Sequence, residues 1–130
     1  MSDSQSLEEL SPARTILIVE DDADIGEFLV NAIEDEIHSH VLLARDGDEA
    51  LKFISTVTPA FLLLDYQLPG MSGLQLYDQF QSREELKTVP VLFMSANPPV
   101  KELELRHLQY IGKPFELDDF LRTLKELLAE

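Results

Sequence analysis

The chain has 130 residues and 45% hydrophobic content, which suits one domain with a single sizeable core. Its 10 Lys and Arg residues are scattered among 25 Asp and Glu, for a formal net charge of −15, and this disfavours direct nucleic-acid binding because phosphate contacts need clustered positive charge. The lack of cysteine excludes disulfides, thiolate zinc sites and a catalytic thiol, and no apolar run approaches the roughly 18 residues of a membrane span.

The N-terminal segment, residues 1–14, is polar and acidic. We expect a flexible tail there, followed by one domain over 15–130; a short partner-binding turn within 7–10 is the alternative for the tail. The segment lacks the basic and apolar regions of a signal peptide. We therefore expect a soluble, cytoplasmic protein.

From Thr15 onward, short apolar runs alternate with segments of helical period. The apolar runs predict strands over 15–19, 40–44, 61–65, 89–95 and 108–112. The periodic segments predict helices over 23–37, 47–54, 74–80, 100–107 and 116–129. Five such units predict an α/β fold, a doubly wound five-stranded parallel sheet with helices on both faces.

The first and last predicted helices each carry an apolar face. In the first, that face comprises Ile25, Phe28, Leu29, Ala32 and Ile33. In the last, it comprises Leu117, Phe120, Leu121, Leu124 and Leu128. We expect both faces to be buried against the sheet.

Carboxylates follow two of the predicted strands. Glu20 and Asp21 come directly after "TILIV", and Asp65 ends "FLLLD". Ligands of open parallel sheets gather at the carboxyl ends of the strands, so these three acids are expected to meet in one crevice. Oxygen ligands without Cys or nearby His suit Mg²⁺, which completes its coordination with water and phosphate oxygens. The site therefore points toward phosphoryl chemistry.

Two further strand ends carry groups suited to a phosphoryl oxygen. Ser95 ends "FMS" with a hydroxyl donor, and Lys113 in "GKPF" offers a point charge. A cis Lys113–Pro114 bond would aim the ammonium inward, although cis is the minority state of such bonds.

The ordered motifs "IVEDD", "LLLDYQLPGMSG", "FMSA" and "YIGKPF" resemble the receiver domain of two-component response regulators, in the CheY-like superfamily. The resemblance runs from about Arg14 to Glu130. It implies the strand order 2-1-3-4-5. It also implies that Asp65 accepts a phosphoryl group from a phosphohistidine of a sensor histidine kinase or a histidine phosphotransfer protein.

The resemblance assigns roles to the other site residues as well. Mg²⁺ would be bound by Glu20, Asp21, Asp65 and the backbone carbonyl of Gln67, with Asp21 the direct ligand in preference to Glu20. Phosphate binding and switching would fall to Ser95, Lys113 and the rotamer-changing Tyr110. Gln67 and Asn97 would influence how fast the acyl phosphate hydrolyses.

Other residues have ordinary interpretations. Asp22 is expected to cap the helix that follows it rather than to bind metal. Gly70 and Gly73 are expected to permit positive φ in the loop after Pro69. The three histidines, His38, His40 and His107, are expected at the surface, outside the crevice.

The chain departs from the receiver pattern between Ser95 and Lys113, which are closer together than usual by about one helical turn. We expect Asn97 to cap a fourth helix whose first position is Pro98, and that helix to be short or displaced. Because this region commonly serves dimerisation or output, a weak homodimer is the most that the resemblance supports.

The leading hypothesis is a stand-alone receiver, not an enzyme beyond assisting its own phosphorylation and slow dephosphorylation. It would switch its binding to a downstream effector protein, as a shuttle, a phosphate sink or a relay intermediate. One alternative is a receiver-like interaction module that works without phosphorylation. A haloacid dehalogenase-type phosphatase is another, but it normally needs an acid where the chain has Gln67. Flavin binding, as in flavodoxins, lacks a suitable phosphate loop.

Overall fold

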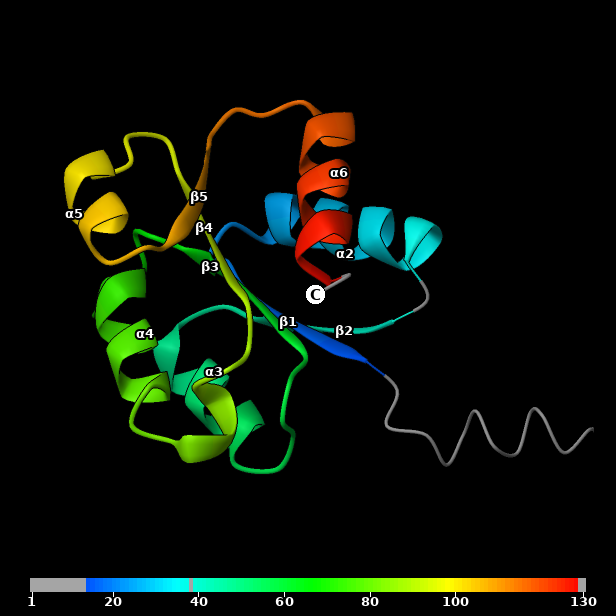
Figure 1. The fold of residues 1–130 in the computed structure, drawn as a ribbon. Helices are drawn as coiled ribbons and strands as arrows, with labels where there is room; N and C mark the ends of the chain where they lie inside the picture. Colours follow the sequence, from blue (N-terminus) through cyan, green and yellow to red (C-terminus); the bar gives the residue numbers. More distant parts are fainter. Residues whose placement is uncertain (1–13, 38, 129–130) are drawn as a thin grey trace, which may run out of the picture.

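A computed structural model of the protein describes residues 14–37 and 39–128 (Figure 1). Five parallel strands form one sheet in the order β2-β1-β3-β4-β5, which confirms the predicted fold class. The order reverses between β1 and β3, the place where ligands bind in such sheets. The strands are β1 (Thr15–Val19), β2 (His40–Ala44), β3 (Phe61–Asp65), β4 (Val91–Ser95) and β5 (Gln109–Gly112).

Helices cover both faces of the sheet. In Figure 1, α2 and α6 lie on one side, and α3, α4 and α5 lie on the other. A single turn of 3₁₀-helix, η1 (Glu84–Leu86), precedes β4. The helices are α2 (Ala23–Glu36), α3 (Gly47–Ile54), α4 (Gly73–Phe80), α5 (Val100–Leu105) and α6 (Leu117–Leu128).

The central strands are buried on both faces because their side chains alternate between two cores. Ile16 and Ile18 of β1 pack toward α2 and α6, whereas Leu17 and Val19 pack toward α3 and α4. Each of these side chains is at most 1% exposed, and burying one contributes roughly 1.5–3 kcal/mol. The continuous apolar run thus fixes β1 in the middle of the sheet and its carboxyl end at the site.

Asp22 caps α2, as predicted. Its Oδ1 accepts hydrogen bonds from the backbone N–H groups of Asp24, at 2.9 Å, and Ile25, at 3.1 Å. These donors would otherwise be unsatisfied at the helix start. The cap ends the turn after β1 and leaves Glu20 and Asp21 at the edge of the sheet.

The buried face of α2 differs from the predicted one. Leu29 and Ile33 are buried as expected, but Ile25 is 37% exposed and Phe28 is 54% exposed. Gly26 faces the sheet instead, and a Cβ there would lie 2.8 Å from a methyl carbon of Leu43. Because α2 approaches the sheet closely at this glycine, its first two turns present a different face to the sheet from the predicted one. The side chains of Ile25 and Phe28 therefore point outward.

The fourth helix of the predicted series, α5, is short, with six residues, but the expected cap is wrong. The helix begins at Val100, Pro99 occupies the capping position, and no side chain caps it. Pro98 cannot be the first helical residue because the proline after it disfavours the helical conformation. Asn97 instead donates its backbone N–H to Ser95 Oγ at 3.1 Å.

The end of α5 is a left-handed turn. His107 has φ 57° and donates its backbone N–H to the Glu104 carbonyl, while Leu108 donates to the Leu103 carbonyl. This is a Schellman motif with histidine where glycine is usual. Leu103 and Leu108 join the same apolar cluster and hold the turn in place.

The surface histidines are placed in part. His40 and His107 are exposed, as predicted, whereas His38 and residues 1–13, including almost all of the expected tail, lie outside the described residues. Among the helices that the structure describes, none is long and apolar enough to cross a membrane.

Candidate functional site

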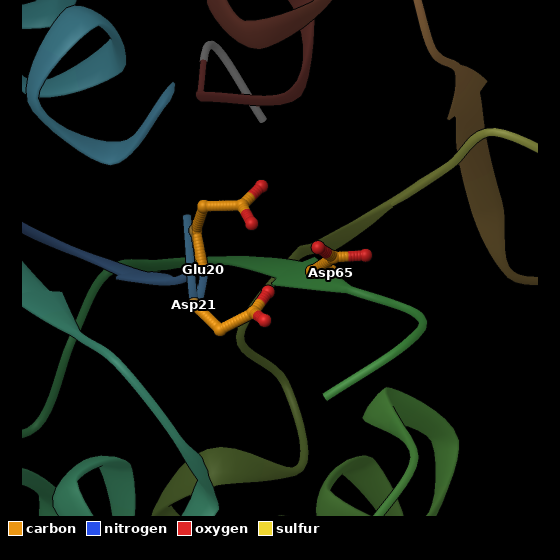
Figure 2. A group of neighbouring side chains, drawn as sticks. All are labelled: Glu20, Asp21 and Asp65. Carbon is orange, nitrogen blue, oxygen red and sulfur yellow. The ribbon is translucent and has the colours of Figure 1, made fainter. Parts of the chain in front are cut away.

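The carboxyl ends of β1 and β3 bring three carboxylates together. Glu20, Asp21 and Asp65 each place an oxygen within 4.8 Å of the others, and Figure 2 shows them gathered at the edge of the sheet. Glu20 is 1% exposed and Asp65 6%, whereas Asp21 is exposed. Two acids of this cluster are therefore largely removed from water, and the third faces it.

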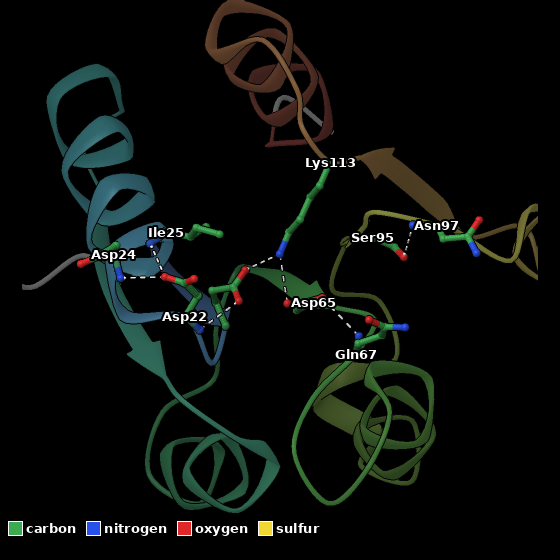
Figure 3. A network of polar contacts seen from close by, with 9 residues as sticks. Asp22, Asp24, Ile25, Asp65, Gln67, Ser95, Asn97 and Lys113 are labelled. Atoms are coloured by element: carbon green, nitrogen blue, oxygen red, sulfur yellow. Dashed lines mark hydrogen bonds and ion pairs between the residues drawn. The ribbon is translucent and has the colours of Figure 1, made fainter.

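Lys113 extends over these acids from the loop after β5 (Figure 3). Its Nζ lies 2.6 Å from Glu20 Oε1 and 3.0 Å from Asp65 Oδ2. Its backbone N–H donates to the Ser95 carbonyl at 2.8 Å, and the Lys113–Pro114 peptide bond is cis. One ammonium thus neutralises part of the charge of two buried carboxylates, an arrangement that requires good geometry to offset desolvation.

The two partners of this contact have shifted protonation equilibria. Burial raises the pKa of Glu20 to about 7, an effect that its hydrogen bond from Lys113 reduces and its proximity to Asp65 increases. Burial alone would lower the pKa of Lys113, but its hydrogen bonds to Glu20 and Asp65 outweigh that effect and raise it. Lys113 therefore stays charged, and the Glu20 carboxyl gains or loses its proton near neutral pH.

The loop after β3 packs closely against the main chain of Asp65. A Cβ on Gly73 would lie 2.2 Å from the Asp65 carbonyl oxygen, and Gly73 donates its N–H to the Tyr66 carbonyl at 2.7 Å. The backbone N–H of Gln67 donates to Asp65 Oδ1 at 3.1 Å. Gly70 has positive φ, as predicted, whereas Gly73 starts α4 and is needed for close approach.

The pocket around the acids contains only some of the predicted site residues. Besides Glu20, Asp21, Asp65 and Lys113, it is lined by Gln67 from the predicted set. The remaining lining residues, which the sequence did not single out for this role, are Asp22, Ile25, Leu68, Pro69 and Ala96.

Ser95, Asn97 and Tyr110 lie to the side of the pocket. Ser95 is 2% exposed, and its Oγ accepts from the Asn97 N–H, on the side away from Asp65 (Figure 3). Tyr110 lies opposite Phe93 in the β4–β5 register and packs on the α3–α5 face of the sheet. The structure thus places the expected switch residues on adjacent strands without bringing them to the acids.

The donor set fits Mg²⁺. Three carboxylates from two strands offer only oxygen, and part of their charge is unmatched because one ammonium serves two of them. Mg²⁺ takes such ligands and retains several waters, which the exposed carboxylate of Asp21 would permit. Glu20, Asp21 and Asp65 are the residues that would hold the ion.

An apolar groove adjoins the pocket, and sequence reasoning missed it. The exposed side chain of Phe28 on α2 faces the loop before α6, where Phe115 stacks on Phe120 with ring centroids 5.1 Å apart. Ile25, Ala96 and Lys113 line both the groove and the pocket. Phe28 and Phe115, each near a site motif, were the available signals.

The fold and the site define a class: a doubly wound parallel sheet with an acidic, lysine-bridged pocket at its topological switch point. The response regulator receiver domain family matches residues 16–125. The chain belongs to this family and has the CheY-like fold. Receiver domains are signalling switches of two-component systems, bind Mg²⁺ at an acidic pocket, and interact with histidine kinases and effectors.

Several known proteins resemble the chain. The transcriptional regulatory protein DltR of Streptococcus agalactiae is 36% identical over 85% of the chain, and the hybrid signal transduction histidine kinase D of Dictyostelium discoideum is 27% identical over 96%. The match spans 50% of DltR and 8% of the kinase. The non-phosphorylated receiver domain of HemR from Leptospira biflexa superposes with a TM-score of 0.80 at 30% identity, covering 90% of this chain and 95% of that one.

Proposed function

We propose that Asp65 accepts a phosphoryl group from a phosphohistidine of a sensor histidine kinase or histidine phosphotransfer protein. The observation that carries this proposal is the contact of the Lys113 ammonium with both Asp65 and Glu20, at the end of β3 beside Asp21. It places positive charge beside a nucleophilic carboxylate in a pocket that is open to a donor.

The geometry supports a direct transfer from the donor to Asp65. The P–N bond of the phosphohistidine breaks as a P–O bond to an Asp65 carboxylate oxygen forms, and the ring, protonated on its other nitrogen, leaves as neutral imidazole. The Lys113 ammonium, 3.0 Å from Asp65 Oδ2, is placed to stabilise negative charge on the transferred group. The Gln67 N–H orients the acceptor carboxylate by donating to its Oδ1.

Residues around the acceptor would share the remaining roles. Mg²⁺, when bound, supplies positive charge to the oxygens of the transferring group. We assign its binding to Glu20, Asp21, Asp65 and the Gln67 carbonyl. Gln67 and Asn97 would tune hydrolysis of the acyl phosphate.

The phosphorylated Asp65 would offer a new acceptor to the Ser95 hydroxyl. Ser95 would then leave its contact with Asn97, and Tyr110 would repack on the adjacent strand. The resulting change of surface at β4 and β5 would be recognised by an effector protein. The net charge of −15 favours a protein over a nucleic acid in that role.

The test is intact-protein mass after incubation with acetyl phosphate, with and without Mg²⁺. The wild type should gain about 80 Da, one phosphoryl group, only when Mg²⁺ is present. Asp65→Asn should gain nothing, while Asp24→Asn, a change at an exposed aspartate of α2, should label like the wild type. Equal labelling of Asp65→Asn would contradict the assignment.

We further propose that the phosphodonor is a protein that docks in the apolar groove. The groove shares Ile25, Ala96 and Lys113 with the pocket, so a partner seated there could present its phosphohistidine to Asp65. The kinase supplies the phosphoryl group from ATP, which places the exchange in the cytoplasm.

Phe28→Ala removes the aromatic side chain of α2 that lines the groove and is 54% exposed. It should slow transfer from a phosphorylated histidine phosphotransfer protein about tenfold, while leaving labelling by acetyl phosphate unchanged. Leu105→Ala, at an 81% exposed leucine outside the groove, is the control. If both variants slow transfer equally, the groove is not the docking surface.

A further inference from the structure

Arg106, directly after α5, joins the end of this short helix to α4. Its guanidinium forms an ion pair with the carboxylate of Asp78, 28 residues away in the sequence. The same guanidinium lies over the ring of Tyr77, 5.6 Å from its centroid. Arg106 therefore binds two neighbouring side chains of α4 at once, one by charge and one by a cation–π contact.

The turn that presents Arg106 is held in an unfavourable conformation. His107, the next residue, has φ 57°, which costs free energy in any residue other than glycine. Such a conformation persists only where surrounding contacts impose it. The contacts here are the two backbone hydrogen bonds that close α5 and the packing of Leu108 in the core.

The anchor of Arg106 reaches the strands that carry the expected switch residues. The Tyr77 ring packs edge-on against Phe93, with centroids 5.8 Å apart. Phe93 lies two residues before Ser95 on β4 and opposite Tyr110 on β5. A change in the position of Arg106 would therefore alter the packing against β4 and β5.

The other end of α5 is tied to Ser95. Its Oγ accepts from the Asn97 N–H, and the stiff pair Pro98 and Pro99 leads from there into the helix. In the proposed switch, Ser95 gives up the Asn97 contact to reach a phosphoryl group on Asp65, which frees this loop to move. The prolines would pass the displacement to α5, whose far end Arg106 holds.

We propose that the contacts of Arg106 with Asp78 and Tyr77 form a latch that holds α5 in its unphosphorylated position and thereby restrains phosphorylation of Asp65. This inference rests on the proposed function of Asp65. If the latch is made only in the unphosphorylated arrangement, then by linkage its removal favours the arrangement that Asp65 phosphorylation requires.

The experiment measures the rate of labelling by acetyl phosphate with Mg²⁺, from intact-protein mass, for wild type, Arg106→Gln, Asp78→Asn and the double variant. Both single variants should label about two- to fivefold faster than the wild type. The double variant should be no faster than the faster single variant, because one latch is lost in each case. Thermal unfolding of each variant checks that it is folded.

The control is Arg122→Gln, which breaks the comparable ion pair with Asp119 on α6. It should label at the wild-type rate. Long-range electrostatics cannot imitate the expected result: loss of the Arg106 charge would slow the approach of an anionic donor, whereas loss of the Asp78 charge would speed it. Loss of the latch, by contrast, speeds labelling in both variants.

The outcomes separate the two proposals. If the wild type is labelled and Arg106→Gln is labelled at the same rate or more slowly, the latch alone is overturned. The latch is also overturned if Arg122→Gln accelerates labelling as much as Arg106→Gln does. A wild type that no phosphodonor labels, or that labels no better than Asp65→Asn, overturns the function of Asp65 and the latch together.

Discussion

The two halves of the carboxyl edge of the sheet differ in how complete they are. At β1 and β3, Glu20, Asp21 and Asp65 already lie together under Lys113. At β4 and β5, the Ser95 hydroxyl is bound to a backbone N–H of its own loop. The half at β1 and β3, proposed to accept the phosphoryl group and here called the acceptor half, is assembled. The half at β4 and β5, proposed to switch and here called the switch half, is held apart from it.

This difference assigns a physical task to each half. Charged groups that are already in place cost no reorganisation when a phosphoryl group arrives, so the acceptor half suits catalysis of transfer. A switch needs two arrangements of similar free energy, and side chains bound elsewhere provide the second one. Substitutions in the acceptor half test its rigidity and its charge, and substitutions in the switch half test its strain.

The largest effect is expected at Gly73, which supports the acceptor half. Gly73→Ala would place a Cβ 2.2 Å from the backbone oxygen of Asp65, which cannot rotate away. We expect the free energy of unfolding to fall by about 3 kcal/mol, measured by urea denaturation. In Gly47→Ala, the added Cβ meets the flexible side chain of Met71, so the loss should stay below about 1 kcal/mol. Similar losses in both variants would show that the Asp65 main chain is not rigidly held.

The second prediction concerns the charge of the acceptor half. Mg²⁺ binds carboxylates in their ionised form, and the pKa of Glu20 is raised to about 7. The Mg²⁺ affinity should therefore rise about tenfold between about pH 6 and pH 8, as measured by titration calorimetry. Glu20→Gln should flatten this dependence, whereas Glu27→Gln, at an exposed position on α2, should preserve it.

The same pKa sets the sign of a stability effect in metal-free protein. The folded state holds the Glu20 proton more tightly than the unfolded state, whose pKa is the ordinary 4.5. The stabilising contribution is therefore complete below about pH 4.5 and is lost as the pH rises through about 7. Glu20→Gln should remove this loss, and an unchanged pH dependence of unfolding would contradict the shift.

The smallest effect is expected at His107, in the switch half. Glycine adopts positive φ without strain, so His107→Gly should raise the free energy of unfolding by about 1 kcal/mol. Gly70 has φ +81°, and an added Cβ there would have no atom within 4 Å. The reverse substitution, Gly70→His, should therefore lower the free energy of unfolding by a similar amount. If His107→Gly is neutral or destabilising, the turn after α5 is not strained.

Much of the fold could be predicted from the sequence because its signals are local. The apolar run of β1 and the period of α6 depend only on neighbouring residues, and both elements occur within one residue of their expected bounds. The gathering of Glu20, Asp21 and Asp65 also followed, since parallel strands end at one edge.

The remaining features depend on packing between distant segments. The helical period predicted that Phe28 is buried, whereas its side chain is exposed. The period carries no information on how closely Gly26 approaches β2, and this approach decides which face of α2 is buried. The pairing of Arg106 with Asp78 joins residues 28 positions apart, and no local pattern announces it. The cap assigned to Asn97 was wrong for a local reason, the effect of one proline on the residue before it.

The close packing of Gly73 against the Asp65 carbonyl has a practical use. It fixes the main chain at this position whatever side chain is attached, so Asp65→Cys would present a thiol where the carboxylate now lies. The chain has no cysteine of its own, and that thiol would be unique. Alkylation with a phosphonate reagent would then give a permanently charged analogue of the acyl phosphate proposed at Asp65, suitable for isolating a partner that recognises this form.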